Sequence, residues 1–210
     1  MRFLCVSDIH GHAAALDTVL QVARARGYDA LLACGDHLFP GPAPLETWKL
    51  LVDNKAVLTQ GVGDLALAQL DVSELEATTP DEAERLERLK ALHGQLGELI
   101  VARLGKLPAQ ARLHLENGDE MLVVHGSPVD HTECFAPEME EEEIMALLGD
   151  DPADVIVCGG SHTAFDLTVL DTRIVGVGSV GEAPGGGYAA ATFLESTPLG
   201  IAVEQITIDL

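Results

Sequence analysis

CVSDIHGH at residues 5–12 is the first of four short apolar runs that each end in acidic or imidazole side chains, followed by LLACGDH at 31–37, MLVVHGS at 121–127 and VIVCGGSHT at 155–163. An apolar run of this length, ended by glycine or a polar residue, is typical of a strand buried on both faces. The carboxyl ends of parallel strands meet at one edge of a sheet. The sequence therefore predicts that Asp8, His10, Asp36, His125 and His162 converge at such an edge.

The residue types in this set favour a metal site. Carboxylate oxygen and neutral imidazole nitrogen suit Mn, Fe, Zn or Ni, whereas Ca and Mg prefer oxygen ligands alone. A single histidine or Gly-Asp pair carries little information, but four such motifs in order, each after an apolar run, favour one common site. We therefore expect a divalent transition metal and a hydrolase that uses it.

The order D-x-H, G-D, H-G and a glycine-rich stretch ending in histidine closely resembles the calcineurin-like metallophosphoesterases, in particular their small single-domain bacterial branch. The resemblance covers nearly the whole chain. It implies that Asp8, His10, Asp36 and His162 hold one ion, that Asp36 also bridges to a second ion, and that His125 belongs to the second. Asp36 and His125 are the catalytic residues that the resemblance implies.

The chain departs from the family at two motifs. Residues 61–64 read GVGD where the family carries G-N-H-D or G-N-H-E. Val62 replaces the asparagine that ligates the second ion, and Gly63 replaces the histidine that protonates the leaving group or steadies the phosphate. Gly160 replaces the first histidine of the closing G-H-x-H. The resemblance thus leaves the second ion only the bridging aspartate and His125.

Three other polar residues could complete a remodelled second site, namely His12, His37 and Asp64. A structural role is the alternative for each, and we favour it for each taken singly. His12 could cap the helix that begins near residue 13, and His37 could be a solvated loop residue.

Length and composition predict one globular domain over residues 1–210, since 47% of the 210 residues are hydrophobic. No apolar stretch reaches the length of a bilayer span, and the amino terminus has no signal-peptide core. We expect a cytoplasmic protein with no membrane partner.

The charge balance bears on the partners of the protein. With 12 Lys and Arg against 34 Asp and Glu, the formal net charge is -22. Because nucleic-acid binding depends on basic side chains that neutralise phosphates, no nucleic-acid partner is expected. A small phosphorylated substrate remains compatible if a metal supplies positive charge, and the oligomeric state stays open.

The first half of the chain predicts alternating strands and helices. Strands at 2–7, 30–34 and 56–60, with a helix at 13–26 and a second helix that contains Trp48, Leu50 and Leu51, form a β-α-β-α-β pattern, which implies parallel strands. A helical insertion is expected at about 72–108, with the helix-start signal TPDE at 79–82. In the family such an insertion often overhangs the site, and simple packing is the equal alternative.

The second half predicts a hairpin at 111–124, an acidic helix at 138–148, a strand at 155–158, a hairpin at 165–177 and terminal strands at 188–195 and 201–208. We expect the two terminal strands to complete a second sheet. The predicted fold is α/β, with two mixed β-sheets packed as a sandwich and flanked by helices in four layers.

Two functions follow from this reading. The leading hypothesis is a metal-dependent phosphoesterase, a phosphatase or phosphodiesterase, in which metal-activated water hydrolyses a small phosphomonoester or phosphodiester. The alternative is a binding or scaffold protein that keeps a degenerate phosphoesterase fold, with one metal or none and little catalysis. The residues missing at positions 62, 63 and 160 motivate the alternative.

Overall fold

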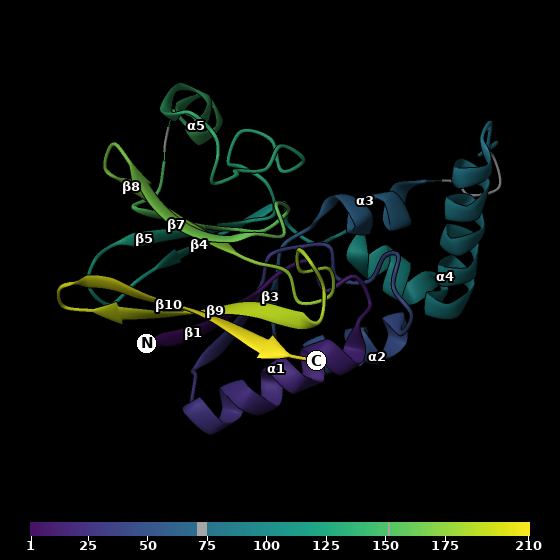
Figure 1. Cartoon of the computed structure of the whole chain (residues 1–210), viewed down its shortest axis with the longest axis horizontal. Helices are drawn as coiled ribbons and strands as arrows, with labels where there is room; N and C mark the ends of the chain where they lie inside the picture. The colour runs from purple at the N-terminus through teal and green to yellow at the C-terminus, as the bar shows by residue number, and fades with distance from the viewer. Residues whose placement is uncertain (71–74, 151) are drawn as a thin grey trace.

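The computed structural model describes residues 1–70, 75–150 and 152–210 and contains two five-stranded sheets with helices around them (Figure 1). The strands are β1 (Arg2–Val6), β2 (Ala30–Ala33), β3 (Val57–Leu58), β4 (Gln110–His114), β5 (Glu120–Val124), β6 (Val155–Cys158), β7 (Ala164–Val169), β8 (Thr172–Val177), β9 (Tyr188–Thr197) and β10 (Gly200–Asp209). The helices are α1 (Ala13–Arg26), α2 (Pro44–Asp53), α3 (Val62–Gln69), α4 (Pro80–Leu104) and α5 (Glu141–Leu148).

The first sheet has the strand order β10-β9-β1-β2-β3. β2 pairs in parallel with both β1 and β3, which confirms the parallel strands expected from the first half of the chain. Leu4 and Val6 of β1 belong to the core cluster that includes α1, whereas Phe3 and Cys5 belong to the cluster shared with the second sheet. Both faces of β1 are therefore buried, which explains its continuous apolar run.

The second sheet, with the order β4-β5-β6-β8-β7, packs face to face against the first. Val123, Val157 and Val175 point into the core between the sheets. Leu122 and Ile156, one residue earlier in their strands, pack with α5 on the outer face. The order α1, first sheet, second sheet, α5 gives the four layers that Figure 1 shows, and it confirms the predicted fold class.

The expectation that the two terminal strands complete a second sheet is wrong. β9 pairs antiparallel with β1, and β10 pairs antiparallel with β9, so both extend the first sheet. The physical reason is the apolar face of β9, because Ala189, Ala191 and Phe193 alternate into the core beneath α1.

The expected helical insertion corresponds mainly to α4, and residues 72–74 of the predicted range 72–108 lie outside the described residues. Thr79 caps α4, since its side chain accepts a hydrogen bond from the Glu82 amide at 3.2 Å, as the TPDE sequence predicts. Gly97 interrupts the helix with φ 71° and ψ 164°. No helix in the described ranges is both long and apolar enough to cross a membrane.

The helix α5 begins at Glu141, three residues after the predicted start of the helix at 138–148. The Glu143 carboxylate accepts a hydrogen bond from the Glu140 amide at 2.9 Å, which makes Glu140 the residue before the first turn. The acidic first turn lies where the helix dipole favours negative charge.

Candidate metal centre

The expected site residues all lie in loops that follow the carboxyl ends of strands. Asp8 and His10 follow β1, Asp36 follows β2, His125 follows β5 and His162 follows β6. β1 is parallel to β2, and β5 is parallel to β6, so each pair of strands ends on the same side. The amide of His10 donates to the carbonyl of Asp36 at 2.9 Å, which ties two of these loops together.

The first candidate group joins Asp8, His10 and His162. Oδ1 of Asp8 lies 3.4 Å from Nε2 of His162 and 4.0 Å from Nε2 of His10, and the two nitrogens are 3.2 Å apart. Oδ1 of Asp8 is buried and has no hydrogen-bond partner among the described residues. Because an unpaired buried carboxylate oxygen is costly, the donor set and its spacing fit a shared divalent metal.

The imidazoles of the site present Nε2 inward because backbone carbonyls hold their Nδ1 atoms. His162 Nδ1 lies 3.1 Å from the carbonyl of Glu182, and His125 Nδ1 lies 2.8 Å from the carbonyl of Cys34. His10 Nδ1 contacts the carbonyl of Phe39 in the same way. An N–H donated to a carbonyl leaves the other ring nitrogen with a free lone pair, which is the tautomer a metal requires.

The second candidate group joins Asp8, Asp36 and His125. Oδ2 of Asp36 lies 3.6 Å from Nε2 of His125, and Oδ1 accepts a hydrogen bond from the Gly63 amide at 2.6 Å. The resemblance implied Asp36 as the carboxylate common to both ions. Among the described residues, Asp8 belongs to both candidate groups and Asp36 to the second.

Four of the candidate ligands share a left-handed backbone. The φ angles are 50° at Asp8, 48° at His10, 50° at Asp36 and 58° at His162. This region costs residues with a side chain about 1–2 kcal/mol each. Such conformations persist where the surrounding structure enforces them, and they concentrate at functional sites.

The charges of the site favour an ionised Asp8. Burial alone would raise the pKa of the Asp8 carboxyl, but the facing His162 ring and the charge of His125 lower it. The Asp8 carboxylate in turn raises the pKa of His162. Burial raises the pKa of Asp36, and the charge of Asp64 adds to this rise while His125 opposes it. A metal would compete with a proton at His162.

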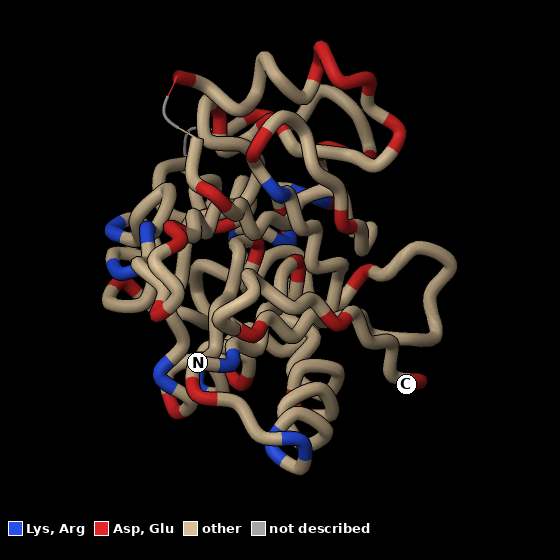
Figure 2. The backbone as a smooth tube through the Cα atoms, turned by 90° about the vertical axis from the view of Figure 1, so that its left-hand side faces the viewer, with Lys and Arg blue, Asp and Glu red and all other residues tan. Residues whose placement is uncertain are grey.

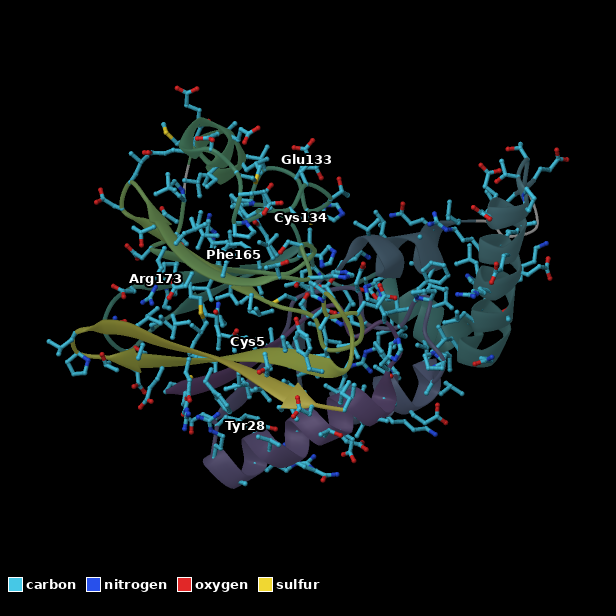
Figure 3. The ribbon with its side chains drawn as sticks, in the orientation of Figure 1. Cys5, Tyr28, Glu133, Cys134, Phe165 and Arg173 are labelled. Atoms are coloured by element: carbon cyan, nitrogen blue, oxygen red, sulfur yellow. The ribbon has the colours of Figure 1, made fainter. Side chains whose placement is uncertain are left out.

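Cys134 occupies the space that a side chain at Gly160 would need. A Cβ atom built at Gly160, where φ is +75°, would lie 2.0 Å from Cys134 Sγ. Figure 3 shows Cys134 in the loop between β5 and α5. Burial, together with the carboxylates of Asp8 and Asp36, raises the pKa of the Cys134 thiol to about 11. A neutral thiol thus lies where the side chain of a histidine at position 160 would begin.

Val62 and Gly63 line an open cavity of about 460 Å³ together with His10 and Asp36. Val62 is 43% exposed and can offer no ligand. The polar contact of Gly63 is its amide, which donates to Asp36. Val62 and Gly63 therefore provide neither a side-chain metal ligand nor a side-chain proton donor.

His37 and Asp64 hold the loops beneath the site. Both are fully buried, and Asp64 accepts hydrogen bonds from the His37 amide at 3.1 Å and from the Gly61 amide at 3.0 Å. The interpretation of His37 as a solvated residue is therefore wrong. Neither residue belongs to a candidate metal group in the part of the chain that is described, so the geometry favours structural roles.

His12 does not take the capping role considered for it. It stands at the N-cap position of α1, but its side chain makes no capping hydrogen bond. It also belongs to no candidate metal group within the described ranges. Its ring lies against Gly181, where a Cβ atom would come within 2.7 Å of His12 Cδ2.

Glu182 is a site residue that the sequence reasoning missed. Its Oε2 lies 3.7 Å from Nε2 of His10, and its carbonyl positions His162. Glu182 directly follows the segment GSVG at residues 178–181. That adjacency was the available signal, although it does not reveal where the side chain points.

A comparison with family models gives a match over residues 1–196 to the calcineurin-like phosphoesterase superfamily domain. The chain belongs to the calcineurin-like phosphoesterase superfamily. This is a family of phosphoesterases, which are hydrolases, and its members generally use divalent metals. A comparison with curated proteins found no match.

Solved structures share the fold of this superfamily member. The hypothetical protein PH1004 from Pyrococcus horikoshii OT3 superposes with a TM-score of 0.81 at 18% identity, over 99% of this chain and 88% of that one. A metallophosphoesterase from Sphaerobacter thermophilus gives 0.72 at 20% identity, over 98% and 88%. YfcE, a phosphoesterase from E. coli, gives 0.55 at 19% identity over both full chains. At these identities the likeness concerns the fold.

Proposed function

We propose that this chain is a metal-dependent phosphoesterase that hydrolyses a small phosphomonoester or phosphodiester. The observation that carries the proposal is the buried, unpartnered Oδ1 of Asp8 facing the Nε2 atoms of His10 and His162. Three donors aimed at one point, with their other polar atoms already satisfied, have the arrangement of a preorganised ligand set.

The roles proposed for the residues combine the two candidate groups with the ligand set that the family resemblance implies. Asp8, His10 and His162, with Asp36 beside them, would hold the principal ion, and Asp36 and His125 would hold a second, weaker one. A divalent Mn, Fe, Zn or Ni ion would supply positive charge to the phosphoryl oxygens and lower the pKa of a bound water. Asp8 and the two carbonyl-bound histidines keep these donors in one orientation without substrate.

Because position 63 is glycine and not histidine, it supplies no proton donor for the leaving group. A positioned proton donor typically contributes about 10²–10⁴ in rate. We therefore expect fast hydrolysis of esters with a good leaving group, which depart without protonation, and slow hydrolysis of alkyl esters.

The charge of the chain supports a small phosphorylated substrate and disfavours nucleic acid, since acidic residues outnumber basic ones by 34 to 12. We also propose a cytosolic location for the enzyme. Cys5, Cys34, Cys134 and Cys158 are all free thiols, as expected in a reducing compartment.

The test is hydrolysis of bis(p-nitrophenyl) phosphate and p-nitrophenyl phosphate by metal-free protein supplied with Mn²⁺. Turnover should require the metal and should disappear in the Asp36→Asn variant. Asp17→Asn is the matched control, because Asp17 lies on α1 and contacts Gln21 away from the site. Equal rates in the parent and Asp36→Asn would refute the proposal.

A binding or scaffold role is the second candidate, and the packing of Cys134 against Gly160 is what favours it. The Cys134 thiol fills the space that a histidine side chain at position 160 would need, so this position supplies no imidazole ligand for a second ion. This role predicts that the protein binds at most one Mn²⁺ per chain in calorimetry and hydrolyses neither ester. Metal-dependent turnover would exclude it.

A further inference from the structure

Two arginines of α4 line the cavity that contains the candidate metal ligands. Arg85 and Arg88 share this space of about 460 Å³ with His10 and Asp36. The arginines are three residues apart, so they project from neighbouring positions on one face of the helix. The cavity therefore brings positive side chains from α4 together with the proposed ligands.

The helix is fixed against the body of the protein by its apolar residues. Leu89 and Leu92 are buried in a core cluster with Leu38 and with Leu67 of α3. Leu38 lies two residues after Asp36 in the same loop. The position of the arginines relative to the metal site is thus set by packing close to the ligands themselves.

These positive charges stand out in a strongly acidic chain. Figure 2 shows Asp and Glu distributed over the backbone, with fewer Lys and Arg. Arg85 makes no ion pair with another described residue, and it is exposed. Arg88 pairs with Glu84 at 2.6 Å, but the two side chains are 56% and 67% exposed. Exposed ion pairs of this spacing contribute little to stability, so Arg88 can leave Glu84 and bind a phosphate group at little cost.

A second cavity, of about 520 Å³, adjoins the first and shares Arg88, Pro40 and Glu182 with it. His12 and Gln95 complete its polar lining. The second cavity therefore adds space next to the one that contains the candidate metal ligands. Arg88 borders both spaces, and Arg85 lines the cavity of the metal ligands.

We propose that Arg85 and Arg88 bind a second phosphate group of the substrate, so that the enzyme selects phosphate esters carrying a further phosphate. This inference rests on the proposed function for the place of the reacting phosphoryl group. Arginine is suited to the task because its planar guanidinium holds phosphate oxygens through paired hydrogen bonds.

The experiment compares two hydrolytically inert probes by calorimetry on the Mn²⁺-supplied full chain, namely propylphosphonate and trimethylene diphosphonate. The parent should bind the diphosphonate at least about tenfold more tightly, as expected for charge-assisted contacts. The Arg85→Gln/Arg88→Gln variant should lose this preference and keep its affinity for propylphosphonate. Lys90→Gln is the control for positive charge on α4, because this substitution removes one cation, half the change in the double variant, at an exposed residue outside the cavity lining.

Equal binding of both probes by the parent, or a preference that survives in the double variant, would overturn the proposal. Circular dichroism of the double variant is the control for correct folding. Hydrolysis of bis(p-nitrophenyl) phosphate, which has a single phosphate, is measured separately. A preference for the diphosphonate without hydrolysis would support the phosphate subsite and refute the proposed function. Hydrolysis without this preference would support the proposed function and refute the subsite.

Discussion

Cys134 packs against Gly160 next to Asp8 of the candidate metal site. The Gly160 amide donates a hydrogen bond to Asp8 Oδ2 at 2.9 Å, and the place of its absent side chain is taken by Cys134 Sγ. The glycine thus orients a proposed ligand through its backbone while the cysteine fills the volume. A larger side chain at position 160 would need the space that Cys134 Sγ occupies.

Restoring histidine at this position should destabilise the protein. Gly160→His would collide with Cys134 and place a side chain in a left-handed conformation, which together should cost about 2–5 kcal/mol of unfolding free energy. Urea denaturation measures the loss. The Gly160→His/Cys134→Gly variant should recover part of it, because the second change removes the thiol from the collision. A single variant as stable as the parent would show that the pairing is unimportant.

Asp64 should behave as a loop anchor and not as a ligand. Asp64→Ala removes the acceptor of two buried amides, so we expect a loss of about 1.5–3 kcal/mol per hydrogen bond to the carboxylate, measured in urea. The conservative Asp64→Asn variant keeps one acceptor and should remain folded. Its affinity for Mn²⁺, measured by calorimetry, should stay close to that of the parent, whereas Asp36→Asn should lose affinity. A comparable loss in Asp64→Asn would make Asp64 a ligand.

The order of the ligand motifs was enough to predict the main layers and the residues that meet at the site. Each of Asp8, Asp36 and His125 follows a run buried on both faces, and parallel pairing brings such ends together. The position of β9 was not predictable in this way. Its alternating apolar residues require a covered face, but which sheet provides the cover depends on packing between distant parts of the chain.

The finer parts of the site depend on contacts that sequence spacing does not encode. Cys134 and Gly160 are 26 residues apart, and their contact arises where two loops cross. Glu182 reaches His10 from another loop. His37 follows a proposed ligand directly, yet its ring turns away toward the Thr59 carbonyl at 3.0 Å. Loop geometry decides each of these placements.

The stability of the metal-free protein should depend on pH through His162. The pKa of His162 is raised in the folded protein by the Asp8 carboxylate. The resulting stabilisation is fully present below the unfolded imidazole pKa of about 6.5 and is lost as pH rises through the folded pKa. The parent should therefore exceed His162→Gln in unfolding free energy by more at about pH 5.5 than at about pH 8.5. A difference that is constant over this range would contradict the assignment.

The most direct test of the metal centre is the rate of bis(p-nitrophenyl) phosphate hydrolysis as Mn²⁺ is added stepwise to metal-free protein and to the Asp8→Asn variant. Asp8 contributes to both candidate groups, so we expect that the parent gains activity with added metal and that Asp8→Asn stays inactive. No activity in the parent at saturating Mn²⁺, or equal activity in the variant, would contradict a metal-dependent phosphoesterase built on these residues.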